Sequence, residues 1–183
     1  MYCDLVVAEK NKKEILQLAK SLGFGKVYFI KPSDILESVK EARKKEGFVI
    51  IKGGNDTINR AAVSCRQVDV LLNPEPPTKD SLTQRNSGLN QVLCKLAAKN
   101  NVTIAFSFDR LFLGHEMIGK IMQNIKLCRK YKVSMIFVTL AKDKYQLRSA
   151  IDMLSIARLL GMEPGQAKRS LTHLQEIAQK KGL

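Results

Sequence analysis

The amino-acid sequence alternates between short apolar runs and longer segments with helical spacing, from its first residues to its last. The apolar runs are rich in Val, Ile, Leu and Phe and have the length of β-strands. Six runs are predicted as strands: 4–7, 27–30, 48–51, 68–72, 102–106 and 133–138. Strands that alternate with helices pair in parallel through right-handed crossovers. Because these runs are apolar on both faces, they are typical of strands buried inside a parallel sheet.

The segments between the strands carry helix signals. Apolar residues recur at three- and four-residue spacing, and glycines or prolines stand where helices stop or start. Helices are predicted over 11–22, 33–45 with Ser33 as N-cap, 57–65, 86–100 with Asn86 or Ser87 as N-cap, 115–131, 149–160 with Ser149 as N-cap, from 164 onward, and over 173–181. Residues 73–85 contain three prolines, so a long loop is expected there, and such loops are often functional.

Two architectures satisfy this alternation, an open doubly wound sheet and a barrel. No glycine-rich fingerprint follows the first strand, where Val7-Ala8-Glu9-Lys10 stands, and this weakens a nucleotide-binding doubly wound fold. The units recur about every 20 to 30 residues, which suits a compact α/β fold of the TIM-like (β/α) barrel type. At 183 residues the chain is short for that fold, so we expect a slightly incomplete barrel with a missing or irregular strand. A single domain over residues 1–183 is predicted, since no linker or repeat divides the chain.

Composition excludes several classes of protein. A hydrophobic content of 45% is enough for a core and excludes a disordered basic tail. The longest apolar run, 135–141, is far shorter than a membrane helix, and the acidic start Met1-Tyr2-Cys3-Asp4 predicts no secretory signal. The four cysteines are far apart in apolar segments, so we expect buried reduced thiols in a cytoplasmic protein. Only two histidines are present, which excludes a site built from several histidine ligands.

Positive charge is concentrated in the second half of the chain. The formal net charge is +14, but residues 1–80 hold 14 Lys and Arg against 11 Asp and Glu, whereas residues 81–183 hold 17 against 6. Lysine also serves as a general solubilising residue. Solubility, however, does not require that one half lose its acids. A folded basic domain of this kind typically binds a polyanion, because each phosphate contact releases counterions.

The carboxyl ends of parallel strands, where ligands bind in either architecture, carry more bases than acids. The acids expected there are Glu75, Asp109 and Asp143, too few for a two-metal carboxylate site. The bases expected there are Lys31, Lys52, Arg110, Lys142, Lys144 and Arg148, with Arg85 on the long loop. We interpret these bases as an anion-binding rim. The alternative is that some of these basic residues only face solvent or form local ion pairs.

A second set of bases lies on the predicted C-terminal helices. Lys126 and Lys130 share a helix face with Gln123, and that face is either solvated or a ridge that contacts phosphates. His115 is either a capping residue or a further contact. The full candidate RNA-binding set is Arg85, Arg110, His115, Lys126, Arg129, Lys130, Lys142, Lys144, Arg148, Lys168 and Arg169. Aromatic residues are only 6% and fall mostly inside strands, so we expect recognition of structured RNA by backbone and shape instead of stacking on exposed rings.

Two blocks of the second half carry a family resemblance. Residues 87–102 read Ser-Gly-Leu-Asn-Gln-Val-Leu-Cys-Lys-Leu-Ala-Ala-Lys-Asn-Asn-Val, and residues 122–133 read Met-Gln-Asn-Ile-Lys-Leu-Cys-Arg-Lys-Tyr-Lys-Val. The segments Leu147-Arg148-Ser149 and Leu160-Gly161-Met162 agree as well. This pattern is similar to the archaeal and eukaryotic ribonuclease P protein component 3 family. The resemblance follows nearly the whole chain in order, is most specific over residues 87–167, and includes no catalytic signature.

The resemblance implies a barrel similar to that of the polymerase-and-histidinol-phosphatase phosphoesterases, without their histidine-rich metal site. It implies a subunit of ribonuclease P, the ribonucleoprotein endonuclease that removes the 5′ leader from precursor tRNA. In that family the RNA subunit carries the active site with its Mg²⁺, so no catalytic residue, metal or cofactor is expected in the protein. The implied partners are ribonuclease P RNA and protein component 2, as a heterodimer or heterotetramer, with precursor tRNA contacted indirectly and no membrane.

The residues taken alone leave two other functions open. A small barrel enzyme acting on a phosphorylated metabolite would place Lys52 or Lys142 in a strand-end pocket. A protein–protein scaffold would use an apolar patch, and its basic surface would be incidental. Of the three, an RNA-binding subunit is the one whose affinity for RNA is predicted to fall steeply with salt.

Overall fold

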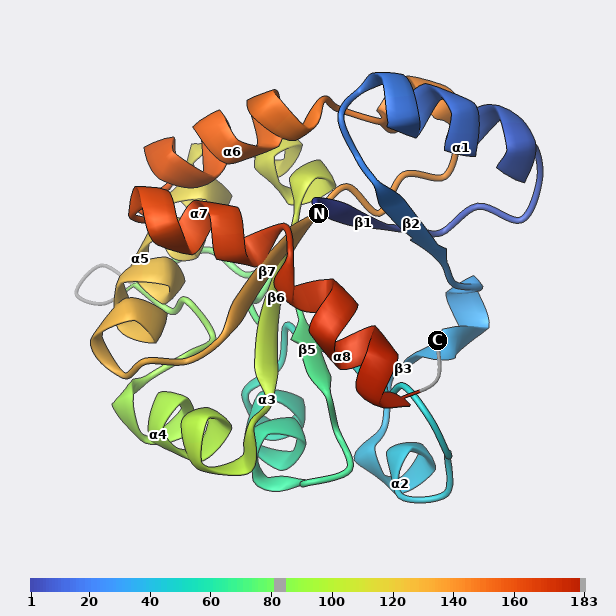
Figure 1. Ribbon diagram of the computed structural model, residues 1–183. Helices are drawn as coiled ribbons and strands as arrows, with labels where there is room; N and C mark the ends of the chain where they lie inside the picture. Colours follow the sequence, from blue (N-terminus) through green and yellow to red (C-terminus); the bar gives the residue numbers. More distant parts are fainter. Residues whose placement is uncertain (81–84, 182–183) are drawn as a thin grey trace.

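The computed structural model describes residues 1–80 and 85–181 and has parallel strands at its centre with helices around them (Figure 1). The strands are β1 (Cys3–Val6), β2 (Lys26–Phe29), β3 (Ile35–Leu36), β4 (Ile50–Lys52), β5 (Val70–Leu72), β6 (Thr103–Ser107) and β7 (Met135–Val138). The α-helices are α1 (Lys12–Ser21), α2 (Val39–Ala42), α3 (Asp56–Ser64), α4 (Gln91–Asn100), α5 (His115–Lys130), α6 (Ala150–Leu159), α7 (Pro164–Ser170) and α8 (His173–Lys181). Short 3-10 helices are η1 (Pro32–Asp34), η2 (Phe108–Leu113) and η3 (Lys144–Gln146).

The strands form two parallel sheets. β1 pairs with β2, and β3 to β7 pair in sequence order. Backbone hydrogen bonds also join β1 to the segment after β7: the Leu140 N–H donates to the Leu5 carbonyl (3.1 Å), and the Val7 N–H donates to the Ala141 carbonyl (3.0 Å). β2 and β3 belong to different sheets, so the described residues form no closed barrel. The predicted fold, α/β with an incomplete TIM-like arrangement, is confirmed.

The predicted helix over 33–45 is wrong. The η1 turn is closed by a hydrogen bond from the Lys31 N–H to the Asp34 carboxylate (2.8 Å). The two residues of β3 that follow pair with β4. The N-cap is Ser38 instead of Ser33, and α2 after it has only four residues. Apolar spacing alone suits a helix here, but the free edge of β4 offers backbone partners to Ile35 and Leu36. The two-residue β3 is the irregular strand expected from the chain length.

Two other helix starts were also predicted. The α4 N-cap is Asn90, later in the chain than predicted, because its side-chain oxygen accepts from the N–H groups of Val92 and Leu93 (2.9 and 3.0 Å). Ser149 caps α6 as predicted, by accepting from the Asp152 N–H (3.0 Å). The later start of α4 leaves 85–90 as an irregular segment beside the helices.

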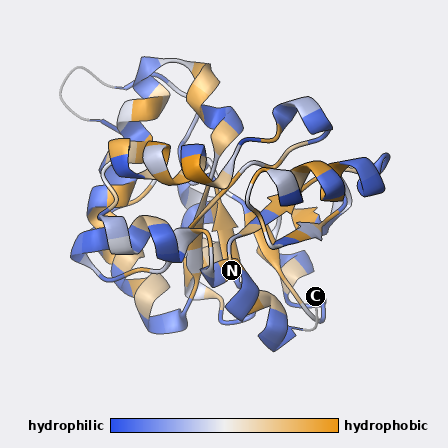
Figure 2. Ribbon diagram, turned by 45° about the horizontal axis from the view of Figure 1, so that its top comes forward, coloured by the Kyte–Doolittle hydropathy of each residue, from blue (hydrophilic) through white to orange (hydrophobic). Residues whose placement is uncertain are grey.

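Buried side chains form two clusters on opposite faces of the strands. Adjacent residues alternate between them, as Ile50 and Ile51 do in β4. The first cluster lies against the surrounding helices, and the second is covered by Leu174 and Ala178 of α8. Figure 2 shows the same division, with hydrophobic residues along the strands and hydrophilic residues on the outer sides of the helices. All four cysteines are free and buried, as predicted.

Helix α8 lies at the amino ends of the strands. A His173 ring nitrogen is 3.2 Å from the hydroxyl of Thr103, at the start of β6. The Lys181 Nζ is 3.2 Å from the carboxylate of Asp69, just before β5. Helix α8 therefore covers this end of the strands. The carboxyl ends of the strands and the outer helices remain as places where a ligand could bind. Across 1–80 and 85–181, no helix combines the length and apolar character that crossing a membrane demands.

Candidate nucleic-acid interface

The carboxyl ends of β5 and β6 are filled by hydrogen-bonded side chains. The Asn73 Nδ2 donates to the Ser107 hydroxyl (2.8 Å), and the Ser107 N–H donates to the Asn73 Oδ1 (3.0 Å). The Ser107 hydroxyl also contacts the Asp109 carboxylate. Asn73 and Ser107 are buried. Asp109, predicted at the end of β6, therefore has a local structural contact with Ser107.

The neighbouring connection is held by Asn59, a fully buried residue of α3. Its Nδ2 donates to the carbonyls of Pro74 (2.8 Å) and Gly88 (2.9 Å), and its Oδ1 accepts from the Gly54 N–H (3.2 Å). These bonds tie the segment after β4 to both ends of the long loop. Lys52, which the metabolite-enzyme alternative placed in a strand-end pocket, instead pairs through its Nζ with the exposed Glu37 (3.3 Å) on the surface.

Glu75, the acid predicted at the end of β5, is fully buried. Its Oε1 accepts from the Nδ2 of Asn124 in α5 (2.8 Å), and the same nitrogen donates to the Ser87 carbonyl (2.7 Å). Burial raises the pKa of Glu75 to about 7, against the opposing effect of the Asn124 hydrogen bond. This carboxyl is a structural link between the loop and α5. Among the described residues, no three His, Cys, Asp or Glu side chains converge where a metal ion could bind.

Helix α5 buries a polar residue that the sequence reading missed. Lys120 is 1% exposed, and its Nζ donates to the carbonyls of Pro76 (3.1 Å) and Thr78. Met122, next to the buried Ile121, is 44% exposed. The signal was present in the sequence, because Lys120 and Asn124 follow helical spacing with the buried positions of α5. The Pro76 and Thr78 carbonyls thus hold this part of the long loop against α5, although Pro77 itself is exposed.

The predicted basic residues fall into three groups. The first lies after β6 and β7 and contains Arg110, Lys142, Lys144 and Arg148. The Arg148 guanidinium stacks over the Phe108 ring at 5.0 Å and donates to the Tyr145 carbonyl (3.0 Å). The Lys144 Nζ is 3.3 Å from a carboxylate oxygen of Glu14. Basic residues therefore gather at the ends of these two strands, and their binding of an anion stays a prediction.

Two aromatic side chains of this first group stand in solvent. Phe112 is 70% exposed and Tyr145 is 80% exposed, and the Phe112 ring meets Phe108 edge-on at 5.3 Å. The expectation that aromatic residues are withdrawn into strands is wrong at these positions, because both lie in 3-10 helices after strands. Exposed rings beside arginine and lysine suit contact with unpaired bases as well as with a protein surface.

The second group lies on α5 and the segment before α4. Lys126 and Lys130 are exposed, and the Nζ atoms of Lys130 and Lys95 lie over the Tyr131 ring at 5.6 and 5.9 Å. Arg85 joins this group by lying against α5 at Gly119, where an added Cβ would be 2.8 Å from its Nη1. The structure thus brings Arg85 to the same helix as Lys126 and Lys130.

The third group is on the other side of α5. Arg129 forms an ion pair with Glu163, and its Nη1 donates to the Gly161 carbonyl (2.9 Å). Arg129, a candidate RNA-binding residue, thus lies in the contact between α5 and the turn from α6 to α7. Lys168 and Arg169 are exposed on α7. His115 is exposed in the first turn of α5, after the N-cap Gly114.

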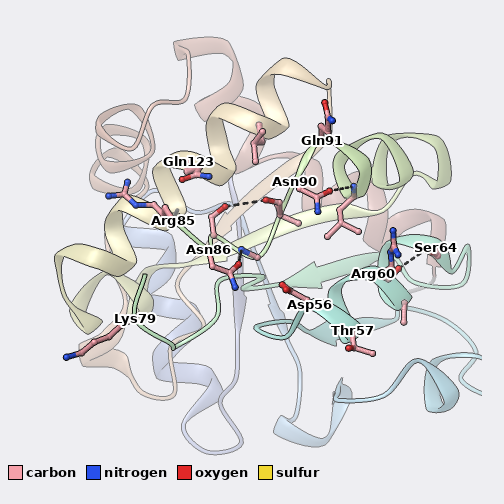
Figure 3. Close-up of a pocket in the computed structure, with 16 residues that line it drawn as sticks. Asp56, Thr57, Arg60, Ser64, Lys79, Arg85, Asn86, Asn90, Gln91 and Gln123 are labelled. Atoms are coloured by element: carbon pink, nitrogen blue, oxygen red, sulfur yellow. Dashed lines mark hydrogen bonds between the residues drawn. The ribbon is translucent and has the colours of Figure 1, made fainter. Parts of the chain in front are cut away.

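A cleft of about 1210 Å³ opens beside the second group (Figure 3). Its walls are α3, residues 85–91 and α5. Figure 3 shows Arg85 and Arg60 at opposite ends, with Asn86 and Asn90 between them, while Lys79 points away from the other side chains. Arg85 was predicted from the sequence, whereas Arg60 and the amides were not, because nothing in their spacing links α3 to residues 86–90.

Comparisons with known proteins agree with this fold. The sequence profile of the family described as RNase P subunit p30 matches residues 26–183. Ribonuclease P protein component 3 of Methanococcoides burtonii is 35% identical over 156 residues, 82% of this chain and 62% of the relative. The protein of the same name from Methanocaldococcus jannaschii is 34% identical over 146 residues, 77% of this chain and 60% of the relative. The chain spans about three fifths of the length of these curated relatives.

Solved structures extend the similarity. A chain in the cryo-EM structure of archaeal Ribonuclease P with mature tRNA matches with a TM-score of 0.67 and 26% identity, covering 98% of this chain and 80% of that chain. An amidohydrolase crystal structure with 14% identity and a TM-score of 0.51 shares the fold alone. The sequence match over most of the chain and this structural match agree, and the chain belongs to the RNase P subunit p30 family.

Proposed function

We propose that the chain is a protein subunit of ribonuclease P, which binds the catalytic RNA and holds it in the shape that removes the 5′ leader from precursor tRNA. The family match over residues 26–183 carries this proposal. The exposed bases support it, since they supply phosphate contacts on α5, on α7 and after β7. The RNA would carry the active site with its Mg²⁺, and the protein would act without a metal or cofactor of its own.

The proposed partners are ribonuclease P RNA, protein component 2 and, indirectly, precursor tRNA, in the cytoplasm. The chain would bind component 2 as a heterodimer or as a heterotetramer. The surface supplies apolar positions for a protein partner: Ile151 and Leu159 on α6 are 74% and 79% exposed. Contiguous exposed apolar surface is typical of interfaces, whereas single exposed apolar residues are common on any protein, so these two positions leave room for a protein contact. A scaffold-like contact with component 2 is thus compatible with RNA binding by the basic groups.

Reconstitution tests the proposed function. The chain is mixed with ribonuclease P RNA and component 2 from the same organism, and precursor tRNA cleavage is measured at limiting Mg²⁺. We expect faster cleavage than in the mixture without this chain, because neutralised phosphates let the RNA fold with less Mg²⁺. A cleavage rate that is the same with and without the chain would contradict the assignment.

Salt dependence separates bases that contact phosphates from bases that hold the fold. Lys126→Ala and Lys130→Ala are each expected to lower the log–log salt slope of RNA affinity by about one, as for the loss of one phosphate contact. Arg129→Ala is the matched control, because its guanidinium is occupied by Glu163 and the Gly161 carbonyl. We expect it to leave the slope unchanged and to lower the unfolding midpoint in urea. Equal slopes for wild type and both lysine variants would remove α5 from the interface.

A further inference from the structure

We propose that the cleft between α3, α4 and α5 binds an unpaired segment of RNA, with Arg85 as its anchor. The proposal rests on the RNA-binding function proposed above and names the kind of RNA that this cleft takes. Its basis is the set of hydrogen-bond donors in the cleft and the way in which the fold positions Arg85.

The amide side chains of the cleft present donors outward. The Asn86 Oδ1 accepts from the Gly88 N–H (3.1 Å), and the Asn90 Oδ1 accepts from two N–H groups in the first turn of α4 (2.9 and 3.0 Å). Because backbone N–H groups fix these two amide orientations, each NH₂ group is left for a ligand. The Gln91 Oε1 likewise accepts from the Tyr131 hydroxyl (3.3 Å). The cleft therefore offers NH₂ donors between two guanidinium groups.

A ligand that fits this cleft carries negative charge and several acceptors along its length. Arg85 and Arg60 at the two ends match phosphates, and the amides between them match base carbonyls or ring nitrogens. Asp56 is the charged acceptor among the described residues that line the cleft, and it matches a ribose hydroxyl or a base amino group. A short single strand of RNA has all of these groups in sequence.

Arg85 is held in place by two contacts of its guanidinium. Its Nε lies 3.1 Å from the Oδ2 of Asp80, and its Nη atoms lie against the backbone of α5 at Gly119. A Cβ at position 119 would be 2.8 Å from Nη1 and 3.2 Å from Nη2. Glycine in the middle of a helix is unfavourable relative to alanine. Its presence at this position leaves the space that Arg85 occupies.

The concave form of the cleft favours an unpaired strand over a duplex. An A-form duplex presents its phosphates on a convex surface, and its base edges are reached only through a wide, shallow groove. Such a surface fits the exposed lysine and arginine side chains of α5 and α7, which lie outside the cleft. Unstacked nucleotides, in contrast, enter a groove and expose the edges of their bases.

The test moves Arg85 without changing the charge of the protein. Gly119→Ala places a methyl group against the end of a flexible side chain, so the fold is kept and the guanidinium is displaced. The probe is a fluorescent single-stranded RNA of about ten nucleotides with mixed sequence, and the same strand annealed to its complement. We expect Gly119→Ala and Arg85→Ala to weaken binding of the single strand about tenfold and to change duplex binding by less than about twofold.

Two control variants match these changes in chemistry. Gly165→Ala adds a methyl group to α7 where nothing lies within 4 Å, and Arg158→Ala removes one exposed positive charge from α6. Both are expected to bind the single strand within about twofold of wild type. If Gly119→Ala behaves like Gly165→Ala, or if single strand and duplex lose affinity equally, the proposal is overturned. A folding check by circular dichroism accompanies each variant, and Arg60→Ala supplies a second test at the other end of the cleft.

The reconstitution assay separates this proposal from the proposed function. Faster cleavage with the chain, together with unchanged oligonucleotide binding by Gly119→Ala, would reject the cleft and retain the ribonuclease P role. Loss of oligonucleotide binding in Gly119→Ala, without any effect of the chain on cleavage, would retain the cleft as a site for unpaired RNA and reject the ribonuclease P role.

Discussion

Gly88→Ala is expected to destabilise the protein by about 4 kcal/mol or more, which is exceptional for one methyl group. Gly88 has a φ of +83°, a backbone conformation that alanine adopts at a cost of about 1–2 kcal/mol. An added Cβ would also lie 1.9 Å from the Pro74 carbonyl oxygen, which itself accepts from Asn59. Since that oxygen is backbone, the loop must move and the Asn59 hydrogen bonds must break. Urea unfolding measures the loss.

Gly23→Ala is the matched control for this variant. Gly23 has a φ of +90°, but its added Cβ would meet only the Ala150 side chain at 3.5 Å, an ordinary contact. We expect a loss of about 1–2 kcal/mol from the backbone conformation alone. Equal losses in the two variants would mean that the contact between Pro74 and Gly88 does not hold the loop. A loss that is larger at Gly88, with weakened binding of single-stranded RNA, would link the loop to the cleft.

The strands were predictable because each is short, apolar and bounded by turn residues. The predicted run 133–138 contains β7, and 102–106 overlaps all but the last residue of β6. The exception, the helix predicted from Ser33, shows where local signals fail. Ile35 and Leu36 have helical spacing with Val39, but their backbone pairs with β4, whose residues are about 15 positions further along the chain. Spacing within one segment carries no information about an available strand edge.

The site was predictable in its residue types and not in its grouping. Basic residues at strand ends and on α5 were identified from charge and spacing; Lys126 is exposed, whereas Arg148 is half-buried against Phe108. Arg129 looked equivalent to Lys126, but its partner Glu163 lies far away in the sequence. Gly119 gave a weaker signal, since a glycine inside a helix is unfavourable unless something needs the space. Its reason, Arg85, becomes visible only when the loop is placed on α5.

Glu75→Gln is expected to stabilise the protein at pH 8 by about 2–3 kcal/mol and to change little at pH 4.5. The folded state raises the pKa of Glu75 from its usual 4.5 to about 7, because the carboxyl is buried. Between these two values the folded protein binds the proton more tightly than the unfolded chain does. The stabilisation from that proton is complete below pH 4.5 and is lost as the pH rises through 7. Glutamine keeps an oxygen for Asn124 and has no charge to bury.

Urea unfolding of wild type and Glu75→Gln from pH 4.5 to 8 tests this, with Glu37→Gln as the control. Glu37 is exposed and pairs with Lys52 on the surface, so its variant should follow the wild-type curve. Asp4, whose pKa burial raises to about 6, remains in every variant and contributes the same slope to each. Curves for wild type and Glu75→Gln that stay parallel across this range would show that Glu75 does not titrate there. Curves that separate above pH 5 would identify a buried carboxyl that costs stability near neutral pH. The role of Glu75 is structural: its carboxyl accepts from Asn124, and Asn124 donates to the Ser87 carbonyl beside the cleft.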